Sequence, residues 1–227
     1  MNVIILAGGR GTRLRPLTFA IPKPLIPVGE KPVMELILER LVGFGFQQVF
    51  LAVGYRAELL ETYFGNGERL GLRLYYHREE IPLGTAGPVR LIRDAFGLVG
   101  TCLVLNADII TNVNFMDLIA WHREKDADMT VVARKYEYKM PFGMLEIEKE
   151  YIHNVQEKPS LTFNISAGIY LLEQPVLNLI PPNRFYDMPD LMLQLIERGM
   201  RLMAYPLTDE WRAIETIDDL EAIYNSS

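Results

Sequence analysis

Residues 6–27 read LAGGRGTRLRPLTFAIPKPLIP, and they directly follow the apolar run NVIILA at the start of the chain. Three glycines lie at the beginning of this stretch: Gly8, Gly9 and Gly11. Glycines after a strand can adopt positive φ and bring backbone N–H groups close to an anion, since no Cβ intervenes. Arg13 and Lys23 add fixed positive charge to the same loop. The stretch therefore predicts a strand followed by a phosphate-binding loop.

Two familiar nucleotide-binding patterns do not fit this loop. A dinucleotide-binding fingerprint needs G-x-G-x-x-G at the start of a helix, but the position three after Gly11 is Leu14, and Pro16 follows soon. A Walker loop needs G-x-x-x-x-G-K-[ST], and no such string occurs in the sequence. A surface turn with solvated arginines explains any two or three of the glycines, arginines and prolines in this stretch, but not the whole string.

Apolar runs of strand length alternate with helical patterns through the first half of the chain. The strand-like runs are NVIILA, QQVFLAVG, LRLYYH and TCLVLN, and the helical segments between and after them include VMELILERLVGFG and AGPVRLIRDAFG. This alternation predicts an α/β fold with a Rossmann-like mixed, mostly parallel sheet flanked by helices on both faces. Function is then expected at the carboxyl ends of the strands.

The pattern becomes less regular after about residue 128. Candidate strands are MTVVAR, GMLEIE, SAGIYLL, RLMAYPL and WRAIE, and candidate helices lie near 173–180, 188–199 and 217–225. We expect one domain over residues 1–227, in which 129–227 form a second layer or smaller lobe packed on 1–128.

Composition limits the classes of partner. The net charge of -6, from 23 basic and 29 acidic residues, argues against nucleic acid, because phosphate backbones need an excess of positive charge on one face. The single cysteine, Cys102, lies in an apolar run and suits a reducing cytoplasm. No run of about 18 apolar residues and no signal-peptide pattern occur, so we expect a cytoplasmic protein without a membrane-spanning segment.

Taken whole, LAGGRGTRLRPLT followed by PKPLIPVGEKP resembles the sugar-1-phosphate nucleotidylyltransferase family. Further matching motifs occur in order along the chain: EEIPLGTAGPV, LNADI, PFGMLEI, QEKP, NISAGIY and FYDMPDL. The set is most similar to short mannose- and heptose-1-phosphate guanylyltransferase-like members. The resemblance implies a fold of the nucleotide-diphospho-sugar transferase type, with 1–128 binding the nucleotide and 129–227 binding the sugar phosphate.

The implied reaction transfers a nucleotidyl group from an NTP to a sugar 1-phosphate and gives an NDP-sugar and pyrophosphate. Two rivals remain open: transfer to another phosphorylated acceptor, and a catalytically weakened nucleotide- or NDP-sugar-binding regulatory protein. Family members often form homodimers, so the resemblance allows a homodimer here.

The resemblance also implies roles for individual residues. Arg13 and Lys23 match basic residues at the triphosphate, and Asp108 matches the carboxylate that holds Mg²⁺. Glu157 and Lys158 match a pair in which the carboxylate accepts from sugar hydroxyls and the lysine meets the sugar's phosphate. The other implied substrate-binding positions are Leu6, Ala7, Gly8, Gly9, Gly11, Thr12, Glu80, Gly84, Thr85, Asn106, Gly143, Asn164 and Ala167. Arg15, in the same loop, is equally consistent with a structural role.

The nucleobase is expected near residues 6–8, with Glu79 and Glu80 closing its pocket. Guanine presents N1–H and N2–H as adjacent donors that one carboxylate can accept together, whereas uracil and thymine present a single N–H. The acidic pair therefore favours GTP, although either glutamate can instead face water.

The sequence departs from the family pattern near its C-terminal end. Relatives carry a second metal-binding aspartate two residues after a tryptophan, but here Trp211 is followed by Ala213 at that place, and Glu215 stands where a glycine belongs. A strand continuing through Glu215 would put its side chain on the same face, about 7 Å further along. We therefore expect Asp108 to be the principal Mg²⁺ ligand and Glu215 a partial, water-mediated substitute.

Overall fold

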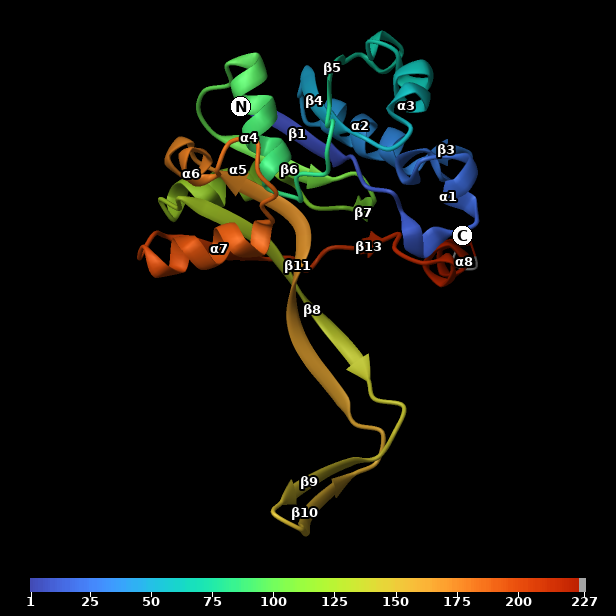
Figure 1. The fold of residues 1–227 in the computed structure, drawn as a ribbon, viewed down its shortest axis with the longest axis vertical. Helices are drawn as coiled ribbons and strands as arrows, with labels where there is room; N and C mark the ends of the chain where they lie inside the picture. Colours follow the sequence, from blue (N-terminus) through green and yellow to red (C-terminus); the bar gives the residue numbers. More distant parts are fainter. Residues whose placement is uncertain (225–227) are drawn as a thin grey trace.

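The central sheet has seven strands in the order β12-β8-β11-β6-β1-β4-β5 in the computed structural model, which describes residues 1–224 (Figure 1). Neighbouring strands pair in parallel except β11, which runs antiparallel to β6 and β8. The mixed, mostly parallel sheet expected from the sequence is thereby confirmed. Its strands are β1 (Asn2–Ala7), β4 (Gln48–Val53), β5 (Arg73–Arg78), β6 (Cys102–Asn106), β8 (Met129–Lys139), β11 (Ser160–Leu172) and β12 (Leu202–Pro206).

Helices cover both faces of this sheet, as the apolar strands predicted. Side chains alternate along β1, so Val3 and Ile5 pack into one apolar cluster and Ile4 packs into another. The first cluster includes α2 (Val33–Gly43), α3 (Ala57–Phe64) and α5 (Phe115–Glu124). The second includes α4 (Gly87–Phe96), α6 (Gln174–Leu179) and α7 (Met188–Glu197), and it contains the buried Cys102.

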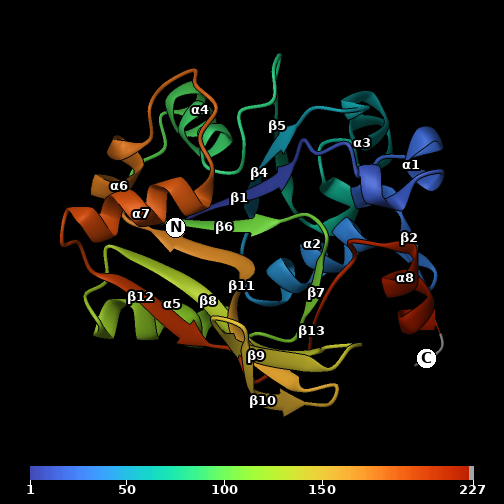
Figure 2. The same cartoon turned by 60° about the horizontal axis from the view of Figure 1, so that its bottom comes forward.

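The C-terminal segment packs against the N-terminal loop. Figure 2 shows the C-terminal helix beside the N-terminal loop segment. A third cluster joins Leu14 and Ile26 of the loop to Ile214 and Leu220, and the Tyr224 hydroxyl donates to the Pro27 carbonyl at 3.0 Å. The end of the helix expected over 217–225 lies outside the described residues. The small elements here are α1 (Leu17–Ala20), β2 (Pro27–Val28), β3 (Lys31–Pro32), β7 (Ile109–Thr111), β13 (Trp211–Ala213), α8 (Ile217–Tyr224) and the 3-10 turns at Thr12–Leu14, Lys23–Leu25 and Glu68–Leu70.

The second half of the chain shares the central sheet with the first half. It adds β8, β11 and β12 to the same sheet, and the outer parts of β8 and β11 leave the body as a two-stranded ribbon (Figure 1). The ribbon ends in the hairpin of β9 (Met144–Glu148) and β10 (Tyr151–Gln156). We refer to residues 135–166 as the arm, and none of them is buried. Over residues 1–224, no helix has the length and apolar character needed to span a membrane.

Candidate active site

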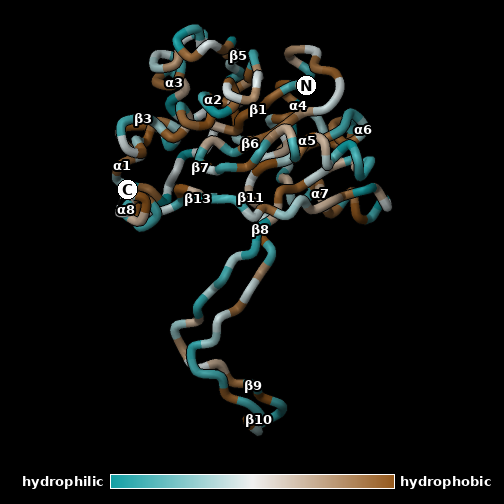
Figure 3. The backbone as a smooth tube through the Cα atoms, turned by 180° about the vertical axis from the view of Figure 1, so that it is seen from behind, coloured by the Kyte–Doolittle hydropathy of each residue, from teal (hydrophilic) through white to brown (hydrophobic). Residues whose placement is uncertain are grey.

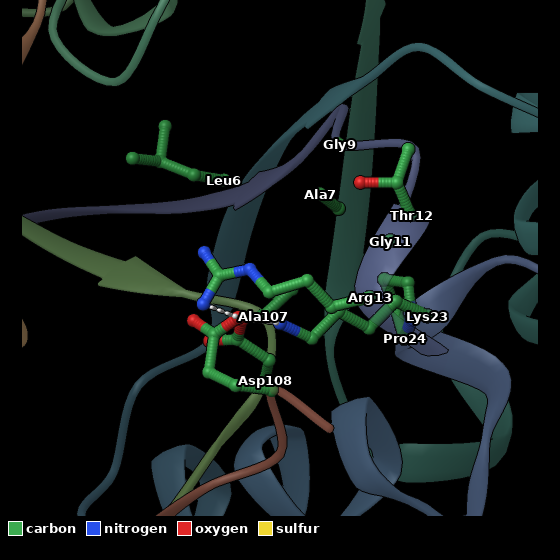
Figure 4. Close-up of a pocket in the computed structure, with 11 residues that line it drawn as sticks. Leu6, Ala7, Gly9, Gly11, Thr12, Arg13, Lys23, Pro24, Ala107 and Asp108 are labelled. Atoms are coloured by element: carbon green, nitrogen blue, oxygen red, sulfur yellow. Dashed lines mark hydrogen bonds and ion pairs between the residues drawn. The ribbon is translucent and has the colours of Figure 1, made fainter. Parts of the chain in front are cut away.

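A pocket of about 200 Å³ lies at the carboxyl ends of β1 and β6, where the parallel strands predicted it (Figure 4). The glycine loop forms one wall, and the segments after β6 and β13 form the others. Its lining residues are Leu6, Ala7, Gly9, Gly11, Thr12, Arg13, Lys23, Pro24, Ala107, Asp108 and Glu215. Segments from the beginning, the middle and the end of the chain therefore meet at one site.

Gly11 fixes the shape of the glycine loop. Its φ is 57°, in the left-handed region, and a Cβ at this position would lie 2.9 Å from the Thr18 Cγ2 atom. The Thr18 hydroxyl donates a hydrogen bond to the Gly11 carbonyl at 2.9 Å. These contacts hold the loop against the 3-10 turn that carries Arg13, so a larger residue at position 11 would displace that arginine.

Two cations and two carboxylates form a chain of ion pairs in the pocket, and Figure 4 labels three of them, Arg13, Lys23 and Asp108. The Lys23 ammonium forms ion pairs with Asp108 and, at 3.2 Å, with Glu215, whose carboxylate also meets Arg13 at 3.3 Å. Burial raises the pKa of Asp108, while the charge of Lys23 opposes this shift. The Arg13 side chain is 71% exposed, whereas that of Lys23 is 13% exposed, so Arg13 stands at the mouth and Lys23 lies inside.

The backbone at Glu215 differs from the strand that the sequence predicted. The strand that we expected through Glu215 ends at Ala213, and the chain then turns. The Ile214 N–H donates to the Asp108 carbonyl at 3.0 Å, and the Glu215 N–H donates to the Asp219 carboxylate at 2.9 Å. This turn places the Glu215 carboxylate in the same pocket as Asp108, so the expected offset along a strand was wrong.

A second pocket, of about 540 Å³, adjoins the first and shares Leu6, Gly9 and Asp108 with it. It includes most of the residues expected around the nucleobase. The rest of its lining is Gly8, Arg10, Gly54, Tyr55, Glu79, Glu80, Pro82, Gly84, Thr85, Pro88, Asn106, Phe185 and Asp187. The structure therefore brings the glycine loop, the acidic pair and the GTAG turn of residues 84–87 together, while their role in binding stays a prediction.

Glu79 and Glu80 differ in their surroundings. Glu79 is partly buried, and its carboxylate accepts a hydrogen bond from the Leu83 N–H at 3.1 Å. Burial raises the pKa of Glu79, and the Leu83 hydrogen bond opposes that shift. Glu80 is exposed. Of the two, Glu79 is therefore the carboxylate held in a fixed position inside the pocket.

Sequence reasoning assigned no role to Asp187, which orients the turn before α4. Its carboxylate accepts from the Thr85 N–H at 2.9 Å and from the Thr85 hydroxyl at 3.1 Å. Gly84 has a φ of 80°, and a Cβ there would lie 2.7 Å from the Asp187 Oδ1 atom. The D-x-x-D pattern of a helix capping box, formed by Asp187 and Asp190, was the available signal.

Several expected site residues lie outside these two pockets. Ala167 is buried in the core, and its carbonyl accepts from the Trp211 indole N–H at 2.9 Å. Arg15 lies over the Phe19 ring, 5.0 Å from its centroid, which indicates a structural role. The expected sugar-binding residues on the arm are Gly143, Glu157, Lys158 and Asn164, and all four are exposed.

A third pocket, of about 680 Å³, lies between the base of the arm and β13 and shares Glu215 with the first pocket. The Arg134 guanidinium lies 4.9 Å from the centroid of the Trp211 ring and donates to the Trp211 carbonyl at 2.8 Å. Its lining is Arg134, Tyr136, Ile165, Trp211, Arg212, Ala213, Glu215, Thr216, Asp219 and Ala222. The first pocket thus shares lining residues with both the second pocket and the third.

Comparison with known proteins supports the resemblance seen in the motifs. The family model described as "Nucleotidyl transferase" matches residues 2–226. The chain is 34% identical to a UTP--glucose-1-phosphate uridylyltransferase from Synechocystis sp., over 96% of this chain and 61% of that protein. It is 30% identical to a mannose-1-phosphate guanylyltransferase from Mycobacterium tuberculosis, over 96% of this chain and 62% of that protein. The chain thus spans about three fifths of the length of these two relatives.

Solved structures of low sequence identity share the fold. A putative glucose-1-phosphate thymidylyltransferase from Bacillus anthracis superposes with a TM-score of 0.81 at 23% identity, covering 100% of this chain and 94% of that one. HddC from Yersinia pseudotuberculosis, in a complex with GMP-PN, superposes with a TM-score of 0.75 at 21% identity, covering 99% of this chain and 98% of that one. These similarities confirm the expected fold class.

Proposed function

The chain belongs to the nucleotidyl transferase family, and on that premise we propose that it transfers a nucleotidyl group from an NTP to a sugar 1-phosphate. The products are an NDP-sugar and pyrophosphate. The observation that carries this proposal is the cluster of Arg13, Lys23, Asp108 and Glu215 beneath the glycine loop. The names of the relatives support the substrate class, since both act on a sugar 1-phosphate.

The arrangement suits a reaction in which two polyanions must meet. The sugar phosphate attacks the α-phosphorus in line with the leaving pyrophosphate, so the site must neutralise charge and align the reactants. Arg13 and Lys23 can exchange their carboxylate partners for phosphate oxygens when the triphosphate enters. Backbone N–H groups around Gly9 and Gly11 would then bind the phosphates from the other side.

The residues present fit a Mg²⁺ ion. The carboxylates of Asp108 and Glu215 both meet the single ammonium of Lys23, so both lie within reach of one cation. Carboxylate oxygens are hard ligands of the kind that Mg²⁺ prefers. No cluster of three or more potential metal-ligating residues occurs within residues 1–224, so phosphate oxygens and water would complete the shell. When bound, Mg²⁺ would neutralise charge developing on the transferred phosphoryl group.

A Glu215→Gln substitution is expected to raise the Mg²⁺ concentration needed for half-maximal turnover by about tenfold, because one of two charged oxygen ligands is lost. Ala213→Asp is expected to raise the affinity for Mg²⁺ by less than about tenfold, since Glu215 already supplies a second carboxylate ligand. Glu221→Gln, at an exposed position of α8, is the matched control. Turnover measured against Mg²⁺ concentration gives the result, and superimposable curves for Glu215→Gln and the parent would remove Glu215 from the metal site.

The base pocket favours GTP in this proposal, because the fixed carboxylate of Glu79 can accept both N1–H and N2–H of guanine. Glu79→Gln is expected to reduce the ratio of kcat/KM for GTP over UTP by about 10- to 100-fold. Since burial raises the pKa of Glu79, its charge destabilises the fold at neutral pH, and Tm should stay equal or rise in this variant.

The matched control is Glu80→Gln at the exposed neighbouring position, which should change neither the base preference nor Tm. An unchanged GTP preference in Glu79→Gln would show that another group reads the base. A parent protein that prefers UTP or dTTP would refute the guanine assignment itself.

Pyrophosphate release tests the proposed activity. The protein should release pyrophosphate with an NTP, Mg²⁺ and a sugar 1-phosphate, and omission of any one should abolish the signal. Phosphocholine and an amino-sugar phosphate test transfer to another acceptor. Nucleotide binding without release for every acceptor would refute the enzyme and favour a regulatory binding protein.

A further inference from the structure

The strand that leads to Glu215 is short. β13 covers three residues, and within residues 1–224 it pairs only with β7, where Ala213 lies opposite Ile109. A two-stranded ladder of this length is marginally stable by itself. Figure 3 shows β13 beside β7, close to the point where β8 and β11 leave the body. Contacts with these neighbouring strands therefore decide where β13 lies.

Trp211 connects β13 to the body of the protein. Its indole N–H donates to the carbonyl of Ala167, a buried residue of β11, at 2.9 Å. The Trp211 side chain also packs against the apolar cluster that includes α2, α3 and α5. The position of the indole ring therefore sets the position of the first residue of β13.

Arg134 of β8 contacts both the ring and the backbone of Trp211. Its guanidinium carbon lies 4.9 Å from the centroid of the ring, and Nη1 donates to the Trp211 carbonyl at 2.8 Å. The Arg134 Nε atom donates to the Lys135 carbonyl at 3.3 Å, which ties the guanidinium to its own strand. A planar guanidinium can stack on an aromatic ring and still donate hydrogen bonds in its own plane, whereas an ammonium is a point charge. Arg134 therefore links β8 to β13 at two points.

The residues directly after β13 contact both carboxylates of the active site. The Ile214 N–H donates to the Asp108 carbonyl at 3.0 Å. The next residue is Glu215, whose carboxylate meets Arg13 at 3.3 Å and Lys23 at 3.2 Å. A displacement of β13 would therefore move Glu215 relative to Asp108 and to the two cations of the pocket.

We propose that Arg134 is a positioning residue for the active site, which fixes Trp211 and, through β13, holds Glu215 beside Asp108. The contacts run without a break from the guanidinium to Trp211, along β13 and through Ile214 to Asp108 and Glu215. Arg134 is not among the residues that line the first pocket, so it acts there through Glu215 rather than by touching the triphosphate.

The alternative role for Arg134 is a direct contact with the acceptor. Arg134 lines the third pocket, which shares Glu215 with the first, so an acceptor phosphate in the third pocket could meet the guanidinium itself. The two roles differ in their kinetics, because a positioning residue changes the response to Mg²⁺ and a binding residue changes KM for the acceptor. The effect on Mg²⁺ rests on the proposed function, whereas the hold of Arg134 on Trp211 does not.

Mg²⁺ dependence tests the positioning role. Arg134→Met removes the charge and the donors but keeps much of the length of the side chain. The Mg²⁺ concentration for half-maximal turnover should rise about tenfold, while KM for the sugar phosphate should change by less than about threefold. Arg134→Lys should recover part of the loss, because an ammonium can still lie over the ring of Trp211. A raised KM for the sugar phosphate at unchanged Mg²⁺ dependence would overturn the proposal and assign Arg134 to the acceptor.

Lys135→Met is the matched control for Arg134→Met. Lys135 is an exposed cation at the next position of β8, so its side chain points to the opposite face of the strand, and its loss should leave the rate and the Mg²⁺ dependence at parental values. A Glu215→Gln background tests the route of the effect. Arg134→Met should there raise the Mg²⁺ requirement by less than about threefold, because it acts through a carboxylate that is already lost. An undiminished effect in that background would overturn the proposal.

Fluorescence quenching tests the contact between Arg134 and Trp211 without any ligand. The chain has two tryptophans, so Trp121→Phe leaves Trp211 as the only tryptophan emitter. In that background, Arg134→Met should raise the quenching of Trp211 by acrylamide, because the ring loses the guanidinium that lies over it. Lys135→Met should leave the quenching unchanged. Equal quenching in the two variants would overturn the hold of Arg134 on Trp211.

The two kinds of measurement separate this inference from the proposed function. A protein that shows the quenching difference but releases no pyrophosphate would refute the proposed function, while the hold of Arg134 on Trp211 would stand. Pyrophosphate release with the same Mg²⁺ dependence in Arg134→Met and Lys135→Met would leave the proposed function in place and overturn the positioning role.

Discussion

Replacing Asp108 with asparagine is expected to lower kcat by at least about 100-fold while leaving the protein folded. Asparagine keeps the shape of the side chain but removes the charge that would hold Mg²⁺ beside Lys23. Burial raises the pKa of Asp108, so ionising this carboxyl costs more in the folded protein than in the unfolded chain. Tm without metal should therefore stay the same or rise, because Glu215 still pairs with Lys23.

Asp117→Asn, at an exposed position of α5, is the control for a general effect of this substitution and should change neither rate nor Tm. The readouts are pyrophosphate release across a Mg²⁺ series and a thermal melt in chelator. If Asp108→Asn retained the parental rate and the parental Mg²⁺ dependence, Asp108 would have no part in metal binding.

Arg13→Ala is expected to lower kcat by about 100- to 1,000-fold, the range seen when a preorganised charged donor is lost from a transition state. The side chain is 71% exposed at the mouth of the pocket, so its removal should leave the fold intact. Arg13 approaches only the carboxylate of Glu215 among its ion-pair partners within residues 1–224, which leaves its remaining donors available to phosphate.

The matched control is Arg15→Ala, two residues further along the same loop. Arg15 lies over the ring of Phe19 rather than in the pocket, so its loss should change kcat by less than about threefold. Equal losses for Arg13→Ala and Arg15→Ala would mean that the loop acts through its overall charge, and would contradict a specific role for Arg13.

The sequence was most informative where local rules decide the structure. The strand before Gly8 and the continuous apolar run before Asp108 predicted two parallel strands, and their carboxyl ends do meet at one pocket. Of the three glycines for which the sequence allowed a positive φ, Gly11 adopts it, whereas Gly8 and Gly9 do not. These features depend on short stretches of chain and on a general rule of α/β sheets.

Features that depend on tertiary contacts could not be predicted from the sequence. The position of Glu215 depends on a turn held by Asp219 and by the Asp108 carbonyl, which a strand pattern cannot indicate. The contact between Asp187 and Thr85 joins residues 102 positions apart. The alternation of apolar and polar residues in β8 and β11 predicts strands whether they lie in the central sheet or in a projecting arm. The separation of Lys158 from the pocket could therefore not be predicted from the sequence.

In the proposed reaction the nucleotidyl group, with its α-phosphorus, moves from a nucleoside triphosphate to a sugar 1-phosphate at the pocket of Lys23 and Asp108, and pyrophosphate leaves. The most direct measurement follows GTP labelled at its α-phosphorus during incubation with Mg²⁺ and mannose 1-phosphate. The label is predicted to appear in an NDP-sugar at the same rate as unlabelled pyrophosphate, in the parent but not in Asp108→Asn. Label that stays in GTP, or that appears in GMP when the sugar phosphate is left out, would contradict this reaction.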